Sequence, residues 1–260
     1  MARPSTTPPD GDGAGLGPYY ELRLYEMRQA RLSAFHDLMG RQVPPLFARH
    51  GVSPPLALWE GHAGPFAPLY GYLLRWSNLD ERMRAWGAFY SDSDWIAAMT
   101  QNYAGQQRVE RAHISFMKAA PLWERFRPAT DAEVDGIYEL RRYDLRGLPK
   151  EASSSAIGDA LDADRDGGGK VMGVFEPVIG TFAPQIVTFV ARADECLGAG
   201  DLSGGTAFRA LPPFDSFLLR PPDYGKAREG FAPRQTGPNA KAPPRAAGTA
   251  DKNTNGSDTP

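Results

Sequence analysis

Cysteine is almost absent from this chain of 260 residues, in which Cys196 stands alone. A single cysteine cannot form a disulfide within the chain, and it excludes a zinc site built from several thiolates. Cys196 follows two acidic residues, and we interpret it as a small apolar side chain near the start of a helix rather than as a nucleophile. The lack of disulfides fits a reducing compartment.

Long apolar runs and an excess of one charge are also missing. No stretch approaches the roughly 18 consecutive apolar residues of a transmembrane helix. The opening residues, MARPSTTPPDGDGAGLGP, lack the apolar core of a signal peptide. The formal net charge of −2 does not favour a nucleic-acid-binding surface, which needs clustered Lys and Arg. We therefore expect a cytoplasmic protein that binds neither membranes nor nucleic acid.

Motifs for nucleotides and metals are absent as well. The chain contains no Gly-x-Gly-x-x-Gly, no Walker A sequence and no Gly-x-Ser-x-Gly. The glycine run at 167–169 has neither the preceding strand nor the helix start of a phosphate-binding loop. No two of the four histidines have the spacing of a zinc site. We expect no metal and no nucleotide cofactor.

The two ends of the chain differ in composition from the middle. Residues 1–17 and 226–260 are rich in Pro, Gly, Ser, Thr and charged residues. Such segments bury too little apolar surface to offset the entropy of ordering, so we expect two disordered tails. The folded region is then 18–225.

Within the folded region several short strings occur twice in the same order. The tetrapeptide YELR at 20–23 returns at 138–141, 118 residues later. Ala67-Pro68 returns at 183–184 and Ser115-Phe116 at 216–217. Ordered matches of this kind predict an internal duplication, with one domain at 18–130 and a degenerate copy at 131–225.

The first copy reads as strand, helix, strand, strand, helix, strand. We predict strands at 19–28, 56–60, 70–76 and 111–118, from alternating or β-branched and aromatic residues. Apolar residues at helical spacing predict a helix over 30–43, which we expect Pro44-Pro45 to end. Ser77 or Asn78, and then the run 91–94, can cap two further helical segments.

The second copy repeats the strands at 136–146, 171–176, 185–192 and 214–220. Its first helical segment contains Gly158 and the run 167–169, so we expect it to be short or irregular. The pattern βαββαβ is that of a ferredoxin-like unit. The fold class is α+β, and two such units can oppose their uncovered sheets to close a shared α/β barrel.

These features resemble the NIPSNAP family. The resemblance rests on the opening strand at 20–25, on Trp59 and Gly64, on the run LRWSNLDER at 74–82, and on Asp92 to Trp95. It covers 19–120 well and 137–221 weakly. It implies a dimeric α/β-barrel fold that usually forms homo-oligomers. The wider superfamily includes cofactor-independent monooxygenases, isomerases, polyketide cyclases and some haem enzymes, and the family is similar to adaptor proteins as much as to enzymes.

Alternation along the first strand places Glu21, Arg23 and Tyr25 on one face. We expect this face to point into the barrel and positions 20, 22 and 24 to point at the helices. The duplicate face consists of Glu139, Arg141 and Tyr143. These groups could bind an anionic or phenolic ligand, or they could form an ion-pair network that ties the two sheets together.

His113 on the fourth strand is the candidate proton acceptor, because imidazole titrates near neutral pH. A structural histidine and, less favoured, a haem ligand are the alternatives. Trp59, Tyr70 and Tyr72 could line an apolar pocket or belong to the core. The leading hypothesis is a cofactor-independent enzyme acting on a small apolar or aromatic metabolite between the sheets, with His113, Tyr25 and Arg23 as catalytic residues. The alternative is a binding or scaffold protein with a filled barrel.

Overall fold

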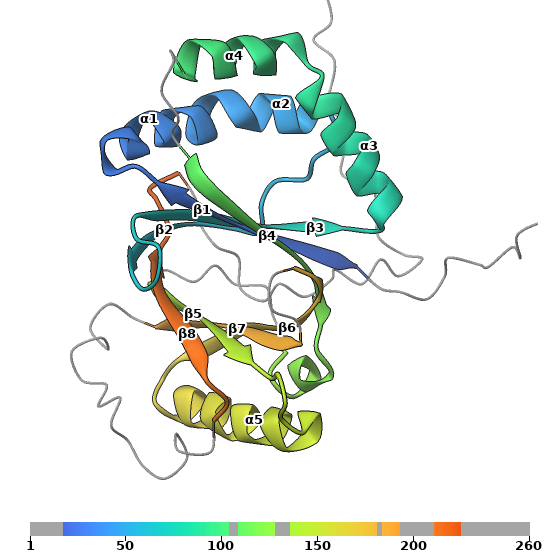
Figure 1. Cartoon of the computed structure of the whole chain (residues 1–260), viewed down its shortest axis with the longest axis vertical. Helices are drawn as coiled ribbons and strands as arrows, with labels where there is room; N and C mark the ends of the chain where they lie inside the picture. The colour runs from blue at the N-terminus through green and yellow to red at the C-terminus, as the bar shows by residue number, and fades with distance from the viewer. Residues whose placement is uncertain (1–17, 104–108, 128–135, 181–183, 193–210, 225–260) are drawn as a thin grey trace, which may run out of the picture.

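The computed structural model describes residues 18–103, 109–127, 136–180, 184–192 and 211–224. Eight strands within these ranges form a closed barrel in the order β1-β3-β2-β8-β5-β7-β6-β4. Helices lie above and below it (Figure 1). The predicted tails at 1–17 and 226–260 lie outside the described residues.

The first half supplies four antiparallel strands and one helix layer. The strands are β1 (Tyr19–Met27), β2 (Ala57–Ala63), β3 (Leu69–Trp76) and β4 (Val109–Ala119), arranged side by side as β2-β3-β1-β4. The helices are η1 (Gln29–Arg31), α1 (Leu32–Asp37), η2 (Leu38–Gln42), α2 (Val43–Arg49), α3 (Leu79–Tyr90) and α4 (Ser93–Tyr103). The element order matches the predicted ferredoxin-like unit.

The second half has the same strand order. It contains η3 (Pro121–Arg125), β5 (Ile137–Asp144), α5 (Lys150–Asp166), β6 (Lys170–Ile179), β7 (Gln185–Arg192) and β8 (Phe214–Arg220), with the strands side by side as β6-β7-β5-β8. The α+β barrel is therefore confirmed. The origin of the two halves by duplication stays a prediction.

Apolar side chains from both halves fill the inside of the barrel. Tyr20, Leu22 and Leu24 of β1 are buried there. Trp59 of β2 stacks on Phe189 of β7, with ring centroids 5.1 Å apart. Burial of large aromatic side chains is the main stabilising contribution of such an interior. The contact between Trp59 and Phe189 shows that the two sheets share one core.

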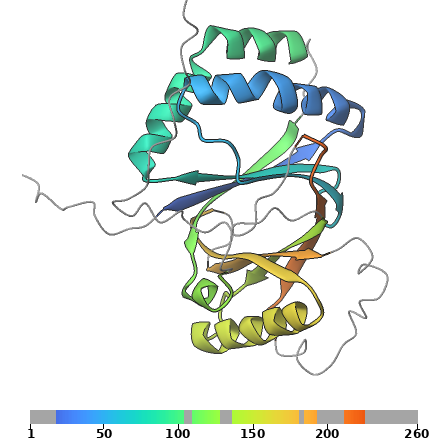
Figure 2. The ribbon, with the colours of Figure 1, turned by 180° about the vertical axis from the view of Figure 1, so that it is seen from behind.

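The helix over α1, η2 and α2 runs further than predicted. Pro44 and Pro45 do not end it, because they lie in the first turn of α2, directly after the π-helical turn η2. The π-helical turn η2 joins α1 to α2. The result is one long helical run across the outer face of β1 and β3 (Figure 2).

Helix α5 is also longer and more regular than predicted, with 17 residues. Gly167 lies just beyond its end, where a helix commonly stops at glycine. Gly158 is buried, and a Cβ atom there would lie 2.9 Å from the Arg125 guanidinium, so this glycine permits close packing of η3. The glycines led to the prediction of an irregular segment, but Gly167 marks the end of a regular helix and Gly158 marks a packing contact.

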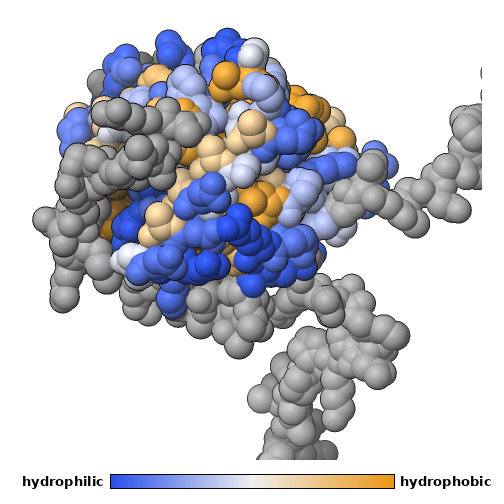
Figure 3. Space-filling view, turned by 90° about the horizontal axis from the view of Figure 1, so that it is seen from below, coloured by the Kyte–Doolittle hydropathy of each residue, from blue (hydrophilic) through white to orange (hydrophobic). Residues whose placement is uncertain are grey.

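The outer surface beside α5 is largely polar. Seen from below, the described face is mostly hydrophilic, with hydrophobic residues in small groups (Figure 3). None of the helices in the described ranges is both long and apolar enough to cross a membrane.

Candidate functional site

A cavity of about 250 Å³ lies between the outer face of the first sheet and its helix layer. Arg23 and Tyr25 of β1, Tyr72 of β3 and Tyr90 of α3 form its polar end. Its remaining walls are almost entirely apolar and include Phe35, Leu38, Met39, Phe47, Phe89 and Trp95. A mostly apolar cavity with a few converging polar groups is the usual form of a small-molecule site.

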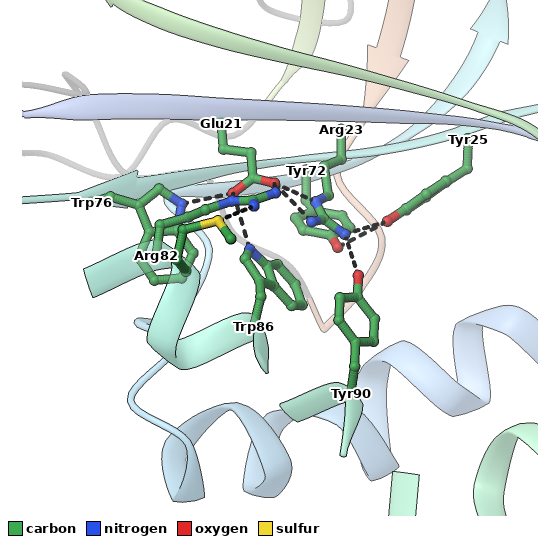
Figure 4. Close-up of polar contacts among 9 residues, drawn as sticks. Glu21, Arg23, Tyr25, Tyr72, Trp76, Arg82, Trp86 and Tyr90 are labelled. Carbon is green, nitrogen blue, oxygen red and sulfur yellow. Dashed lines mark hydrogen bonds and ion pairs between the residues drawn. The ribbon is translucent and has the colours of Figure 1, made fainter. Parts of the chain in front are cut away.

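Glu21, Arg23 and Tyr25 point toward the helices and not into the barrel, so the face prediction for β1 was wrong (Figure 4). Strand alternation tells which residues share a face, but the layer on each side decides which face is polar. The barrel interior takes the face with Tyr20, Leu22 and Leu24, which pack in its apolar core, whereas a buried Arg23 needs polar partners. Helix α3 presents such partners.

Glu21 is a fully buried carboxylate surrounded by donors. Its Oε2 accepts from the indole nitrogens of Trp76 at 2.8 Å and Trp86 at 3.1 Å. Its Oε1 accepts from Arg23 Nε at 2.8 Å and Arg82 Nη2 at 3.0 Å. Burial alone would raise the pKa of Glu21, but the hydrogen bond from Arg82 and the charge of Arg23 outweigh it and lower that pKa. Glu21 is therefore ionised at neutral pH.

Arg23 connects this carboxylate to the cavity. Its Nη1 donates to the Tyr25 hydroxyl at 3.2 Å and to the Tyr90 hydroxyl at 2.9 Å. Its guanidinium carbon lies 3.9 Å from the centroid of the Trp86 ring, within the range of a cation–π contact. Glu21 thus fixes one side of the guanidinium and leaves the other side facing the tyrosines.

The charges of this cluster do not balance. Glu21 supplies one negative charge, whereas Arg23 and Arg82 supply two positive charges, which leaves an excess of one positive charge. Arg23 is 3% exposed, so water screens its charge poorly. An anion in the cavity would compensate this charge.

The tyrosine hydroxyls can donate further hydrogen bonds. Tyr25 and Tyr90 accept from Arg23, and Tyr25 shares a 3.1 Å hydrogen bond with Tyr72 in which either can donate. One proton of the Tyr25–Tyr72 pair and the proton of Tyr90 therefore have no acceptor among the described residues. Burial raises the pKa of Tyr25 and of Tyr72, so both remain protonated donors at neutral pH.

The matching cluster of the second half is balanced. Arg141 binds Glu139 and Asp164, each at 2.6 Å, and Arg192 contacts the same Asp164. Two carboxylates thus face two guanidinium groups. Arg141 and Tyr143 lie on the outer face of β5 toward α5, remote from the cavity of the first half, so the structure does not bring them into one site with Arg23.

His113 lies on the other side of the sheet from Arg23 and Tyr25. It pairs with Leu24, whose side chain points into the barrel. Its Nε2 is 2.6 Å from Glu26 Oε1, and the Phe66 ring stacks on it with centroids 4.9 Å apart. His113 therefore faces the barrel as expected, but it cannot act on the same small ligand as Arg23.

The other predicted site residues separate in the same way. Tyr72 lies at the cavity, Trp59 belongs to the barrel interior, and Tyr70 is buried on the helix side beside Phe35. The described residues contain no group of three His, Cys, Asp or Glu side chains placed to hold a metal ion.

Three residues of the cluster were missed by sequence reasoning, namely Arg82, Trp86 and Tyr90. They are spaced by four residues along α3, which places them on one face of a helix. A basic residue and two aromatic residues at this spacing are the signal that would have identified the helix face opposite β1.

Comparison with known proteins finds a family match in the first half of the chain. Residues 20–123 match the model of the NIPSNAP family. A NIPSNAP family protein of unknown function from Agrobacterium tumefaciens is 18% identical, with a TM-score of 0.35 over 40% of this chain and 89% of that one. No curated protein sequence matches the chain.

Two other solved structures extend over both halves. A candidate monooxygenase from Lactobacillus acidophilus is 9% identical and has a TM-score of 0.50 over 83% of this chain and 98% of that one. Chlorite dismutase from Candidatus Nitrospira defluvii is 12% identical and has a TM-score of 0.48 over 79% of this chain and 92% of that one. At 9% identity the likeness to the structure from Lactobacillus acidophilus concerns the fold alone.

Proposed function

Residues 20–123 of this chain are a NIPSNAP domain, and from that premise we propose that the domain binds a small, mainly apolar molecule carrying an anionic oxygen group. The anionic group would lie beside Arg23, and the apolar part would fill the cavity beneath α1 and α4. A simple aromatic carboxylate has this chemistry. No metal or other cofactor takes part in the proposed binding.

One observation carries the proposal, the excess positive charge at the polar end of an apolar cavity. Glu21 compensates only one of the two arginines it contacts. The hydroxyls of Tyr72 and Tyr90 stand where they can donate to a carboxylate. Charge-assisted hydrogen bonds from a fixed guanidinium and from polarised phenols are the stronger kind.

A cofactor-independent enzyme of the monooxygenase, isomerase or cyclase type is the second candidate. The hydroxyl donors beside Arg23 favour it, because such groups stabilise negative charge that develops on an enolate or phenolate oxygen. The described residues of the cavity include no carboxylate and no imidazole that could take a proton. Binding is therefore the function that the geometry supports better.

Calorimetric titration with benzoate and with its neutral analogue benzamide tests the proposal. We expect benzoate to bind and benzamide to bind much more weakly. Tyr90→Phe and Tyr72→Phe should each weaken benzoate binding by about ten- to a hundredfold, as for loss of a hydrogen bond to a charged group. Tyr143→Phe, beside Arg141 in the second half, is the matched control and should bind as wild type does.

Equal affinity for benzoate and benzamide, or no effect of either tyrosine substitution, would refute the proposed role of the charge. For the enzymatic candidate, incubation with aryl ketones in D₂O provides the measurement. Deuterium incorporation next to the carbonyl that Tyr72→Phe abolishes would favour catalysis, whereas none in wild type would favour binding alone.

A further inference from the structure

The chain after β8 returns to the helix layer of the first half. Figures 1 and 2 show it turning beneath α1. Tyr224, four residues after β8, contacts α1 and η2, although it lies 188 residues after His36 in the sequence. It also lies outside the residues that match the NIPSNAP model.

Three contacts hold the Tyr224 side chain. Its hydroxyl is 2.6 Å from His36 Nδ1 and 3.4 Å from the hydroxyl of Tyr70. Its ring lies on Gly40, where the Cβ atom of any other residue would be 3.3 Å from the ring carbons. Glu60 of β2 lies 3.3 Å from the other imidazole nitrogen of His36, so the orientation of the ring is fixed from both sides.

Gly40 gives independent support for a specific docking position. Glycine is disfavoured relative to alanine inside a helix, because it gains the most backbone freedom on unfolding. Gly40 also lies in the π-helical turn η2, a type of turn that is frequent at functional sites. The absence of a side chain at this position leaves the room that the Tyr224 ring occupies.

The residues that contact Tyr224 are neighbours of the cavity wall. Phe35 and Met39 line the cavity and precede His36 and Gly40 directly in the sequence. Tyr70 packs against Phe35 with ring centroids 4.9 Å apart. A displacement of Tyr224 would therefore change the packing of Phe35 through both His36 and Tyr70.

We propose that Tyr224 is a positioning residue of the cavity, which holds α1 and η2 against the sheet and keeps the bound molecule in place. The proposal rests on the proposed function, because it names how the same cavity is closed. Tyr224 is 41% exposed, so the contact can open without disruption of the barrel core. The second half of the chain thus contributes a side chain to the site of the first.

Tyr224→Phe in the full chain tests this role with two readouts. The variant keeps the ring on Gly40 but loses the short hydrogen bond with His36 and the longer 3.4 Å contact with Tyr70. We expect the affinity for benzoate to fall about two- to tenfold, through faster dissociation, as for loss of one neutral hydrogen bond. Amide hydrogens of residues 35–43 should exchange faster with solvent in the absence of ligand, whereas those of β5 and β7 should not.

Gly40→Ala separates positioning from simple stability. Alanine favours the helix, so the melting temperature should stay level or rise, but the added methyl group displaces the Tyr224 ring. Faster benzoate dissociation at undiminished stability would support the proposal. If both variants bind and exchange as wild type does, Tyr224 is not a positioning residue.

Failure of the proposed function gives a different result. If wild type itself binds no carboxylate, that function is wrong, and exchange at residues 35–43 then decides the role of Tyr224 alone. Faster exchange in Tyr224→Phe would still show that it positions the helix, and unchanged exchange would overturn the inference.

Discussion

Replacement of Glu21 by glutamine should destabilise the protein strongly, although the two side chains have nearly the same shape. Both carboxylate oxygens of Glu21 accept hydrogen bonds, Oε1 from Arg23 and Arg82 and Oε2 from Trp76 and Trp86. Glutamine would place an NH₂ group against one of these sets of donors. It would also leave the two guanidinium groups without a counter-charge.

The magnitude follows from the burial of the group. Glu21 is 0% exposed, and loss of one partner of a buried ion pair costs about 3–5 kcal/mol in the free energy of unfolding. For a folded region of about 150–250 residues, each kcal/mol corresponds to about 2–4 °C in melting temperature. Glu21→Gln should therefore melt about 6–20 °C below wild type.

Differential scanning calorimetry measures this difference, and Glu110→Gln is the control. Glu110 pairs with Arg28 at 2.9 Å on the protein surface, where both side chains are more than half exposed. Such a pair contributes only about 0–1 kcal/mol. A melting temperature of Glu21→Gln close to that of Glu110→Gln would refute the argument that a buried charge stabilises this layer.

Three further outcomes are expected. Asn78→Ala should lower the free energy of unfolding in urea by about 1 kcal/mol, because the Asn78 side chain accepts from the Glu81 backbone N–H at 2.8 Å, and an unchanged midpoint would contradict this cap. Folding lowers the pKa values of Glu21 and Glu139. Their contribution to the free energy of unfolding is therefore complete above the ordinary pKa of 4.5 and is lost as the pH falls through the folded pKa values. In Glu139→Gln, the free energy of unfolding measured from pH 6 to pH 2 should depend less on pH than in wild type. His113→Ala should keep wild-type affinity for benzoate in the calorimeter, because His113 faces the barrel, and a large loss of binding would place the site there instead.

The fold could be predicted from the sequence because its signals are repeated and local. The two YELR strings mark the first strand of each half. Alternation marks most of the other strands, and the capping residues mark helix starts. The predicted strands at 185–192 and 214–220 therefore coincide with β7 and β8. The helix predictions were wrong at prolines and glycines, because the effect of these residues depends on their position within a helix. Pro44 lies in the first turn of a helical segment and Gly167 follows one, and neither interrupts it.

The candidate site could be predicted only in part. Arg23, Tyr25 and Tyr72 were identified from strand alternation, but their side of the sheet depends on Arg82, Trp86 and Tyr90, which come from another element. Tyr224 could not be found by local pattern, because its partners lie far away in the sequence. Assembly into homo-oligomers and the cytoplasmic location stay predictions.

The closure of the barrel has a consequence for how the chain must assemble. Each half has two edge strands, and each edge pairs with the other half, β2 with β8 and β4 with β6. Exposed edges invite pairing with other molecules, so the first half remains vulnerable to aggregation until β8 has been made. The pairing of Glu60 with Arg220 joins residues far apart in the sequence, and contacts of this kind slow folding. The same mutual pairing should allow the two halves, expressed as separate chains, to complement each other and rebuild the barrel.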